Sequence, residues 1–413
     1  MLWETLGFKD EPFKTQPITA STLDLYTGNK EKIKACQFAL SSNNVLMVIE
    51  GSRGMGTTSF GNYLRFKEQE KKKYFTMTSE IRVEPSWNAD TLMAAIISNI
   101  VSTLEQHHSR EVAKNPKFEE SKAIVRRVTE NYRSFGASIF GIGATYGNSA
   151  MTTQPMIMPT QMLANYLEDL VQIIYTLGYK HGILIQLNNL DIGVVQDEDH
   201  LKNLLNIMRD YFQMPGTNWL LVGDLELRKF IAQHVDRVDD IISSEVQITP
   251  LSEDEYMELI QRRVEKYRLS KDIKLPVDKE VWLFLYKITK GRLRYIFGLL
   301  KRLLNMLQVG TLTDKITLDL AKPAIKKYAK DRIKKFNLTD NEVLVLKAVV
   351  ENESIQVNEI AKLVGKKSSQ ISNILSQLQN YKLVSYQKEW RSHYYFPSID
   401  ASIAYMSDEN MIL

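Results

Sequence analysis

The stretch Val45–Ser59 (VLMVIEGSRGMGTTS) constrains the fold of this chain more than any other. It begins with apolar, strand-forming residues, passes through three glycines and ends in polar residues that open a helix. Gly51 and Gly56 are separated by four residues, and Thr58 follows two positions later. This is the spacing of a loop whose backbone N–H groups point at phosphate oxygens from a helix N-terminus. We therefore predict a strand, a phosphate-binding loop and a helix in succession.

One residue in this loop departs from that pattern. Thr57 follows Gly56, where such loops have a lysine that contacts the β- and γ-phosphates. The substitution removes a charge-assisted hydrogen bond worth about 1.5–3 kcal/mol. Arg53 either reaches back toward phosphate or, more simply, is an exposed loop residue. The candidate loop residues are Gly51, Ser52, Arg53, Gly54, Gly56, Thr57, Thr58 and Ser59.

The composition is that of an ordinary globular protein. The chain has 413 residues, 44% hydrophobic and 25% charged, which is enough for two or three domains. The formal net charge is only +4, so any surface that binds nucleic acid must be local. A single cysteine, Cys36, excludes a disulfide framework and suits a reducing compartment. The N-terminus does not resemble a signal peptide and no apolar run reaches 18 residues, so we predict a cytoplasmic protein without a membrane span.

Apolar strands and amphipathic helices alternate up to about residue 250. Four strands are predicted, at residues 45–50, 73–77, 182–187 and 219–223. Their alternation with helices predicts an α/β domain with a parallel sheet and crossover helices. From residue 251 the pattern becomes all helical. The predicted divisions are an N-terminal arm at 1–20, a core at 21–250 with a glycine-rich insertion at 135–159, a helical region at 251–320, a basic linker helix at 321–337 and a separate module at 338–413.

The order of these motifs resembles that of AAA+ ATPases, especially the origin-recognition type and the related STAND-like prokaryotic ATPases. The likeness covers roughly residues 20–320. It rests on Tyr26-Thr-Gly-Asn before the first helix, the loop at Gly51–Thr58, the strand ending in Asn188-Asn189, the strand ending at Gly223, Arg237, and Gly291-Arg-Leu-Arg294. The resemblance implies a P-loop core followed by a helical lid, with ATP or ADP as the ligand.

This chain departs from the family pattern at the catalytic positions. Asn188 stands where the family has the aspartate that coordinates Mg²⁺, and Asn189 where it has the glutamate that orients water. An amide neither deprotonates water nor supplies negative charge to a cation. Together with Thr57, these residues predict a pseudo-ATPase that binds ATP or ADP weakly, without catalytic residues or a metal site. The alternatives are an α/β domain that has lost nucleotide chemistry and an active ATPase with an atypical loop.

Two arginines match positions that the family uses. Arg294 falls at the sensor arginine of the lid, which contacts nucleotide, and Arg237 falls at the arginine finger, which completes the site of a neighbouring subunit. The resemblance thus implies a homo-oligomer or a hetero-oligomer with an active AAA+ ATPase, in which Arg237 acts in trans. The alternative for each arginine is a surface or ion-paired residue.

The C-terminal module follows the order helix, short strand, helix, turn, helix and hairpin, which is that of a winged helix-turn-helix. It resembles the MarR-like members in the sequence Glu359-Ile-Ala-Lys-Leu-Val and in the entry to the wing at Leu383-Val384. Gly365 is the predicted stop of the second helix.

The start and outward face of the third helix are suited to duplex DNA. Short polar side chains and amides meet base edges, and lysines meet phosphates. The predicted DNA-binding residues are Lys366, Lys367, Ser368, Ser369, Gln370, Ser372, Asn373 and, at the wing tip, Arg391. The basic helix before the module adds lysines such as Lys322, Lys326, Lys330 and Lys334, although basic helices are often merely solvated. The alternative is an adaptor whose winged helix docks another protein.

The sequence therefore predicts a DNA-binding AAA+-like protein with a hydrolysis-deficient nucleotide site. It would act as a regulator or scaffold in a DNA transaction. Replication, mobile-element and defence machinery are the settings that the resemblance suggests.

Overall fold

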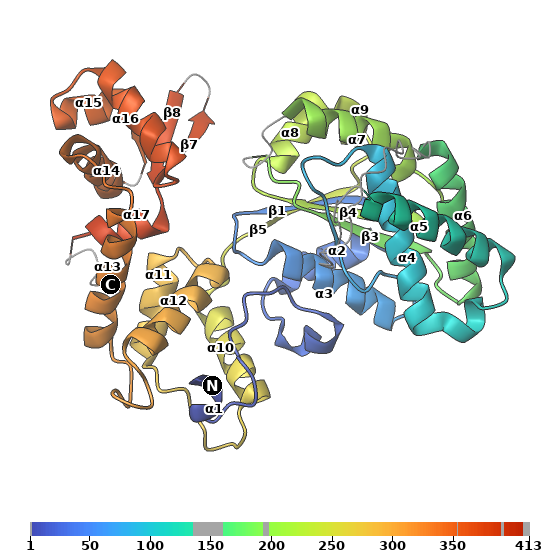
Figure 1. The fold of residues 1–413 in the computed structure, drawn as a ribbon, viewed down its shortest axis with the longest axis horizontal. Helices are drawn as coiled ribbons and strands as arrows, with labels where there is room; N and C mark the ends of the chain where they lie inside the picture. Colours follow the sequence, from blue (N-terminus) through green and yellow to red (C-terminus); the bar gives the residue numbers. More distant parts are fainter. Residues whose placement is uncertain (1, 135–159, 193–197, 353, 390–391, 408–413) are drawn as a thin grey trace. The chain divides into compact units, whose positions relative to one another are not determined.

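Five parallel strands form the sheet at the centre of the larger of two structural units (Figure 1). They are β1 (Leu46–Gly51), β2 (Ile81–Arg82), β3 (Ile183–Asn188), β4 (Thr217–Gly223) and β5 (Ser244–Ile248). Their order across the sheet is β2-β3-β4-β1-β5, and every pair is parallel. The α/β class and the parallel sheet predicted from the sequence are confirmed.

This computed structural model describes residues 2–134, 160–192, 198–352, 354–389 and 392–407. The predicted insertion at 135–159 lies outside the described residues. The core unit comprises residues 16–262, and the C-terminal unit joins residues 1–15 to 263–413. The division falls within α10 (Glu253–Tyr267). Among the described residues, no helix has the length and apolarity needed to cross a membrane.

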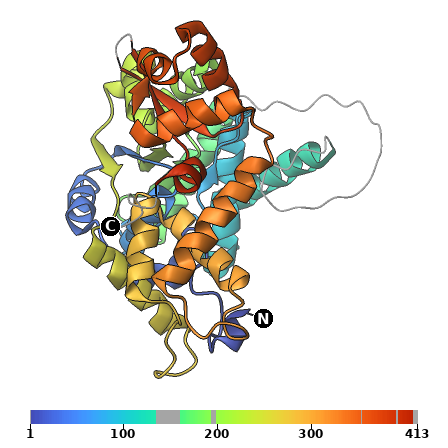
Figure 2. The ribbon, with the colours of Figure 1, turned by 90° about the vertical axis from the view of Figure 1, so that its left-hand side faces the viewer.

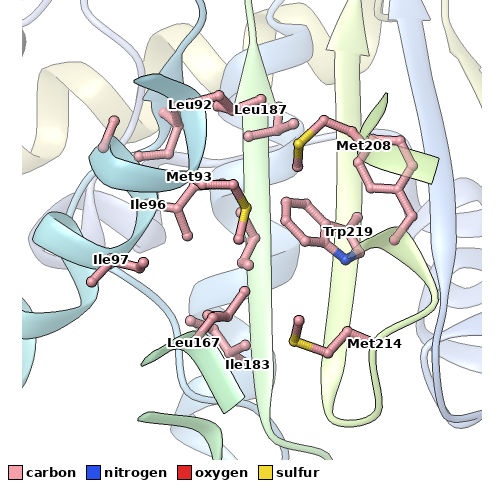
Figure 3. Packing of buried hydrophobic residues seen from close by; sticks show 14 of the residues in the cluster. Leu92, Met93, Ile96, Ile97, Leu167, Ile183, Leu187, Met208, Met214 and Trp219 are labelled. Carbon is pink, nitrogen blue, oxygen red and sulfur yellow. The ribbon is translucent and has the colours of Figure 1, made fainter. Parts of the chain in front are cut away.

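Side chains alternate between the two faces of the central strands and build one core on each face. Leu46 and Val48 of β1 pack with Trp219 of β4 against α4 (Ala89–Val112), α6 (Thr160–Thr176) and α7 (Glu198–Phe212). Figure 3 shows Trp219 within this cluster, with Met208 and Met214 near its ring. The other face packs on α2 (Lys30–Ala39) and α3 (Thr57–Glu70). The remaining helices of the core unit are η1 (Ala20–Leu25), α5 (Pro116–Ser134), α8 (Leu227–His234) and α9 (Asp236–Asp239).

The strand predicted at 73–77 is wrong in its position. Phe75 makes one isolated bridge to Ile183, and the edge strand β2 begins only at Ile81. The backbone between them is bonded to side chains instead. The carbonyl of Met77 accepts from Nη1 of Arg65 at 2.6 Å, and the N–H of Thr78 donates to a threonine hydroxyl of α4. These bonds take the backbone groups that a longer strand would need.

The C-terminal unit contains two sets of elements. The lid helices are α11 (Lys279–Ile288) and α12 (Leu293–Met306), followed by the linker helix α13 (Leu318–Lys334). The winged helix comprises α14 (Asp340–Asn352), β6 (Ile355–Gln356), α15 (Val357–Val364), α16 (Ser368–Asn380), β7 (Val384–Glu389) and β8 (Ser392–Pro397). Its strands form an antiparallel sheet in the order β6-β8-β7, so the predicted winged-helix order is confirmed. A further helix, α17 (Ile399–Tyr405), was not predicted and packs on α13.

The N-terminal arm is part of the C-terminal unit. It contains the short helix α1 (Leu2–Thr5) and the buried rings of Trp3, Phe8 and Phe13. The ring of Phe13 lies 5.2 Å from that of Trp282 and 5.4 Å from that of Phe297, measured between centroids. The arm therefore packs its aromatic side chains into the lid helices.

Asn218 joins three backbone segments inside the core unit. Its side chain accepts from the N–H of Val45 at 2.9 Å and donates to the carbonyls of His181 at 3.0 Å and Ile183 at 3.3 Å. It is only 1% exposed, so bulk water does not share these hydrogen bonds in the folded protein.

We expect Asn218→Ala to lower the free energy of unfolding of the core unit by about 2–4 kcal/mol, because three backbone groups lose a side-chain partner, in two buried bonds and one partly buried bond. Urea denaturation followed by far-UV circular dichroism measures the change. Gln213→Ala is the matched control, since Gln213 is an exposed amide just before the same strand, and it should change stability by less than about 0.5 kcal/mol. Equal stabilities for the two variants would contradict the role of Asn218.

Candidate nucleotide and nucleic-acid sites

The predicted loop connects the end of β1 to the first turn of α3. Gly54 and Gly56 have φ angles of +94° and +98°, a left-handed conformation that favours glycine. Gly51 has a steric requirement instead: a Cβ there would lie 2.7 Å from Cγ2 of Thr57 and 2.9 Å from the carbonyl oxygen of Ile248. All three glycines are thus needed for the chain to turn from strand to helix.

The segment from Ile18 to Tyr26, which contains η1, lies against α3. The N–H of Ile18 donates to Oγ of Ser59 at 3.3 Å, and its carbonyl accepts from the Asn62 side chain at 2.8 Å. The ring of Tyr26 stacks on that of Tyr63, with 4.5 Å between centroids. Ser59, predicted as a loop residue, therefore has a structural role in holding this segment beside the loop.

The second motif ends in a buried, neutral amide. Asn188 is 2% exposed, and its Oδ1 accepts from Nε2 of Gln186 at 3.0 Å. Asn189 is exposed, with φ of +65°. The side-chain oxygen of Asn188, at the position where the resemblance implied a metal-binding aspartate, therefore already accepts a hydrogen bond from a neighbouring donor. The next side chain, that of Asn189, is exposed.

Gln186 is a site residue that the sequence analysis missed. It is fully buried, and Nε2 lies 3.5 Å from the carbonyl oxygen of Thr58. A Cβ on Gly61 would lie 2.8 Å from its Oε1, so Gly61 leaves room for the amide beneath α3. The signal was present in the sequence. Gln186 is a polar residue inside an apolar strand and lies two positions before Asn188, hence on the same face.

The three arginines predicted for nucleotide chemistry are all exposed. Arg53 lies in the loop, Arg237 on the short helix α9, and Arg294 in the first turn of α12 in the C-terminal unit. Close to Arg237, the guanidinium of Arg228 instead forms ion pairs with Asp239 and Glu245. Arg228 therefore has a local structural partner on each side, whereas Arg237 extends into solvent.

The third helix of the winged helix, α16, has one buried and one exposed face. Ile371, Leu375 and Leu378 are buried against the module. The exposed face contains Ser368, Ser369, Gln370, Ser372, Asn373 and, beyond the prediction, Ser376 and Gln377.

The start of α16 has two lysines and a hydrogen-bonded serine. Lys367 is the exposed N-cap residue of the helix, and Lys366 just before it is half-buried. Oγ of Ser368 donates to Oδ1 of Asn358 at 2.9 Å, which ties this end of α16 to α15. Gly365 has φ of +68° and ends α15, as predicted. Arg391, at the predicted wing tip, lies outside the described residues.

Comparison with solved structures identifies the fold. The ORC2 protein of Aeropyrum pernix, solved as ADPNP and ADP complexes, superposes with a TM-score of 0.51 at 14% identity, covering 98% of each chain. The Walker-type ATPase PABY2304 of Pyrococcus abyssi superposes with a TM-score of 0.51 at 11% identity, covering 95% of this chain and 99% of that one. The chain therefore has an AAA+ fold of the origin-recognition type.

The C-terminal module matches a family at the level of sequence. Residues 333–400 match the family described as "Sugar-specific transcriptional regulator TrmB". The MarR-like resemblance is thus refined to a winged helix of the TrmB type. No curated protein matches the chain at a significant level of similarity.

The loop chemistry predicts the outcome of restoring the missing groups. We expect Thr57→Lys to strengthen ATP binding about tenfold or more, because the ammonium group adds a charge-assisted hydrogen bond to phosphate. Thr57→Met, which is of similar length but uncharged, should not strengthen it.

Adding Asn188→Asp to Thr57→Lys should make ATP binding depend on Mg²⁺ but still yield no turnover, because Asn189 cannot act as a base. Fluorescent-ATP titration and phosphate release measure these effects, and turnover by the unaltered chain would contradict them.

Proposed function

We propose that this protein binds duplex DNA through its winged helix and uses a nucleotide-responsive but hydrolysis-deficient AAA+ core as a regulator or scaffold in a DNA transaction. The observation that carries the proposal is the exposed face of α16. It combines an N-terminal lysine, Lys367, with the amides and hydroxyls of Gln370, Ser369 and Asn373. A helix with this composition docks in the major groove, where amides read base edges and lysines contact phosphates.

The type of fold and the family match support this assignment. The matched family is described as a transcriptional regulator, and the winged helix is a recurrent DNA-binding module. The proposed DNA contacts are Lys366, Lys367, Ser368, Ser369, Gln370, Ser372, Asn373 and Arg391. We add Ser376 and Gln377 to the proposal because they are exposed on the same helix.

Weak nucleotide binding without hydrolysis is the second part of the proposal. The glycine conformations of the loop are retained, and the structure of ORC2 from Aeropyrum pernix contains ADPNP and ADP. The proposed nucleotide contacts in the loop are Gly51, Ser52, Arg53, Gly54, Gly56, Thr57 and Thr58. The neutral pair Gln186–Asn188 offers no charge to Mg²⁺, and Asn189 offers no base to water. Bound nucleotide would thus act as a stable ligand rather than a substrate.

We expect Lys366→Gln/Lys367→Gln to weaken binding uniformly across duplex sequences and to reduce the slope of log K against log salt by about 2, because two phosphate contacts are lost. Asn373→Ala should instead reduce discrimination between sequences by about 1–3 kcal/mol at one base pair. Fluorescence anisotropy between about 50 and 200 mM salt measures both effects.

Lys279→Gln is the matched control for that experiment, because Lys279 is an exposed lysine on lid helix α11 and is not among the proposed contacts. It should bind as the unaltered chain does. Absence of duplex binding even at low salt would reject DNA as the partner. It would favour the alternative, in which the winged helix docks a protein.

The exposed Arg237 gives this protein a way to act on the nucleotide site of a partner without hydrolysing ATP itself. We propose that its exposed guanidinium completes the nucleotide site of an AAA+ partner in trans. Arg237→Ala should then reduce the turnover of a candidate partner ATPase by a factor of about 10³ or more relative to the unaltered chain. Lys229→Ala, which removes an exposed cation from the neighbouring helix α8, should leave turnover unchanged. Equal turnover with Arg237→Ala and the unaltered chain would remove this role.

A further inference from the structure

The winged helix is short of positive charge, and the helix before it is rich in it. Residues 338–413 contain seven Lys and Arg residues but nine Asp and Glu residues. Residues 318–337 contain seven Lys and Arg residues and two Asp residues. Because phosphate neutralisation supplies most non-specific affinity for DNA, a module with more acids than bases needs cations from elsewhere. The adjoining source is α13.

One of the α13 cations has a structural role. Nη1 of Arg332 lies 2.6 Å from Oδ2 of Asp400 on α17, and its guanidinium lies over the ring of Tyr328. Arg302 of α12 covers the same ring, 4.6 Å from its centroid. These contacts join α13 to the lid helix α12 and to α17, which in turn packs on α14 of the winged helix.

The lysines of α13 fall into two groups, half-buried and exposed, according to their position around the helix axis. A stripe of small and apolar side chains, Ala321, Ile325, Ala329 and Ile333, is buried. Residues four apart on a helix are displaced around its axis by about 40°. Lys322 and Lys326, in the first half of α13, are therefore half-buried at the edge of the packed side. The exposed side has Lys327, Lys330, Lys334 and, at the C-cap, Lys335. We call these four residues the lysine face.

The lysine face is not neutralised by the protein. In the part of the chain that the structure describes, none of its four lysines forms an ion pair. The acidic residue among them is the exposed Asp331, one carboxylate against four ammonium groups. Like charges three and four residues apart on a helix repel one another by a few tenths of a kcal/mol per pair. A polyanion that lies along the helix would relieve this repulsion.

We propose that the lysine face is a second, sequence-independent contact for the phosphate backbone of duplex DNA. This inference rests on the proposed function and deepens it: α16 reads bases, whereas α13 neutralises phosphates. The ribbon in Figures 1 and 2 shows α13 as one long helix leading into the winged helix. Because Arg332 of α13 pairs with Asp400 of α17, and α17 packs on α14 of the winged helix, the fold sets the distance between the two DNA contacts.

The test uses the full chain with all four lysines of the face changed to Gln. A duplex of about 30 bp, long enough to reach beyond one major-groove site, is titrated at several salt concentrations. We expect weaker binding to every sequence and a slope of log K against log salt that is smaller by about 2–4, with the preference among sequences unchanged. The variant with the four lysines changed to Arg keeps the charge and should bind as the unaltered chain does.

Three results would overturn the inference. The first is an unchanged slope in the Gln variant while Lys366→Gln/Lys367→Gln loses affinity, which leaves the proposed function intact. The second is that the Gln variant binds DNA as the unaltered chain does but loses affinity for anionic vesicles or polyglutamate, which would assign the lysine face to another partner. The third is absence of DNA binding by the unaltered chain, which rejects the proposed function as well. If circular dichroism shows that the four-fold variant does not fold, Lys327→Gln/Lys330→Gln and Lys334→Gln/Lys335→Gln test the two halves separately, each with an expected slope change of about 1–2.

Discussion

The burial of β1 and β4 on both faces is the constraint on which the core unit depends. Odd and even positions of β1 supply two different hydrophobic clusters, so helices must cover both sides of the sheet. Once both sides are covered, the carboxyl edge of the parallel strands remains open for loops. The loop at Gly51–Gly56 and the end of β3 at Asn188 both lie at that edge. The position of the site thus follows from the packing of the sheet and does not depend on the catalytic residues.

The fold therefore does not require charged side chains at positions 57 and 188. A buried carboxylate at position 188 would need a cation, either a metal ion or a lysine, to offset its desolvation. Without a lysine at position 57, such a charge becomes costly, whereas a neutral amide is satisfied by Gln186. Neutral residues at positions 57 and 188 are therefore electrostatically compatible with each other. Hydrogen bonding between Gln186 and Asn188 stabilises the strand end that ion coordination would stabilise in an active site.

The sequence predicted most of the fold because its apolar strands are continuous and its turns have glycines where φ is positive. The winged helix could be recognised for the same reason, with Gly365 ending α15. The sequence-based predictions failed where the structure depends on contacts between residues that are distant in the sequence. A pattern of residues 73–77 indicates a strand, but it does not show that the Arg65 side chain takes the carbonyl of Met77. Local periodicity also failed to reveal α17, a helix of seven residues stabilised by α13. Gln186 was missed because its role depends on a contact with α3.

The N-terminal arm has a consequence for how the chain is made. Trp3, Phe8 and Phe13 are synthesised well before the rings that receive Phe13. Those rings, Trp282 and Phe297, follow some 270 residues later. The core unit can complete its sheet while this arm still lacks its partners, since domains generally fold as units during synthesis. The arm must then close a very long loop, which is slow because the entropy of closure precedes any contact. Until that moment the rings of the arm stay accessible to chaperones, and the core of the lid is complete only after the segment around Trp282 and Phe297 has been made.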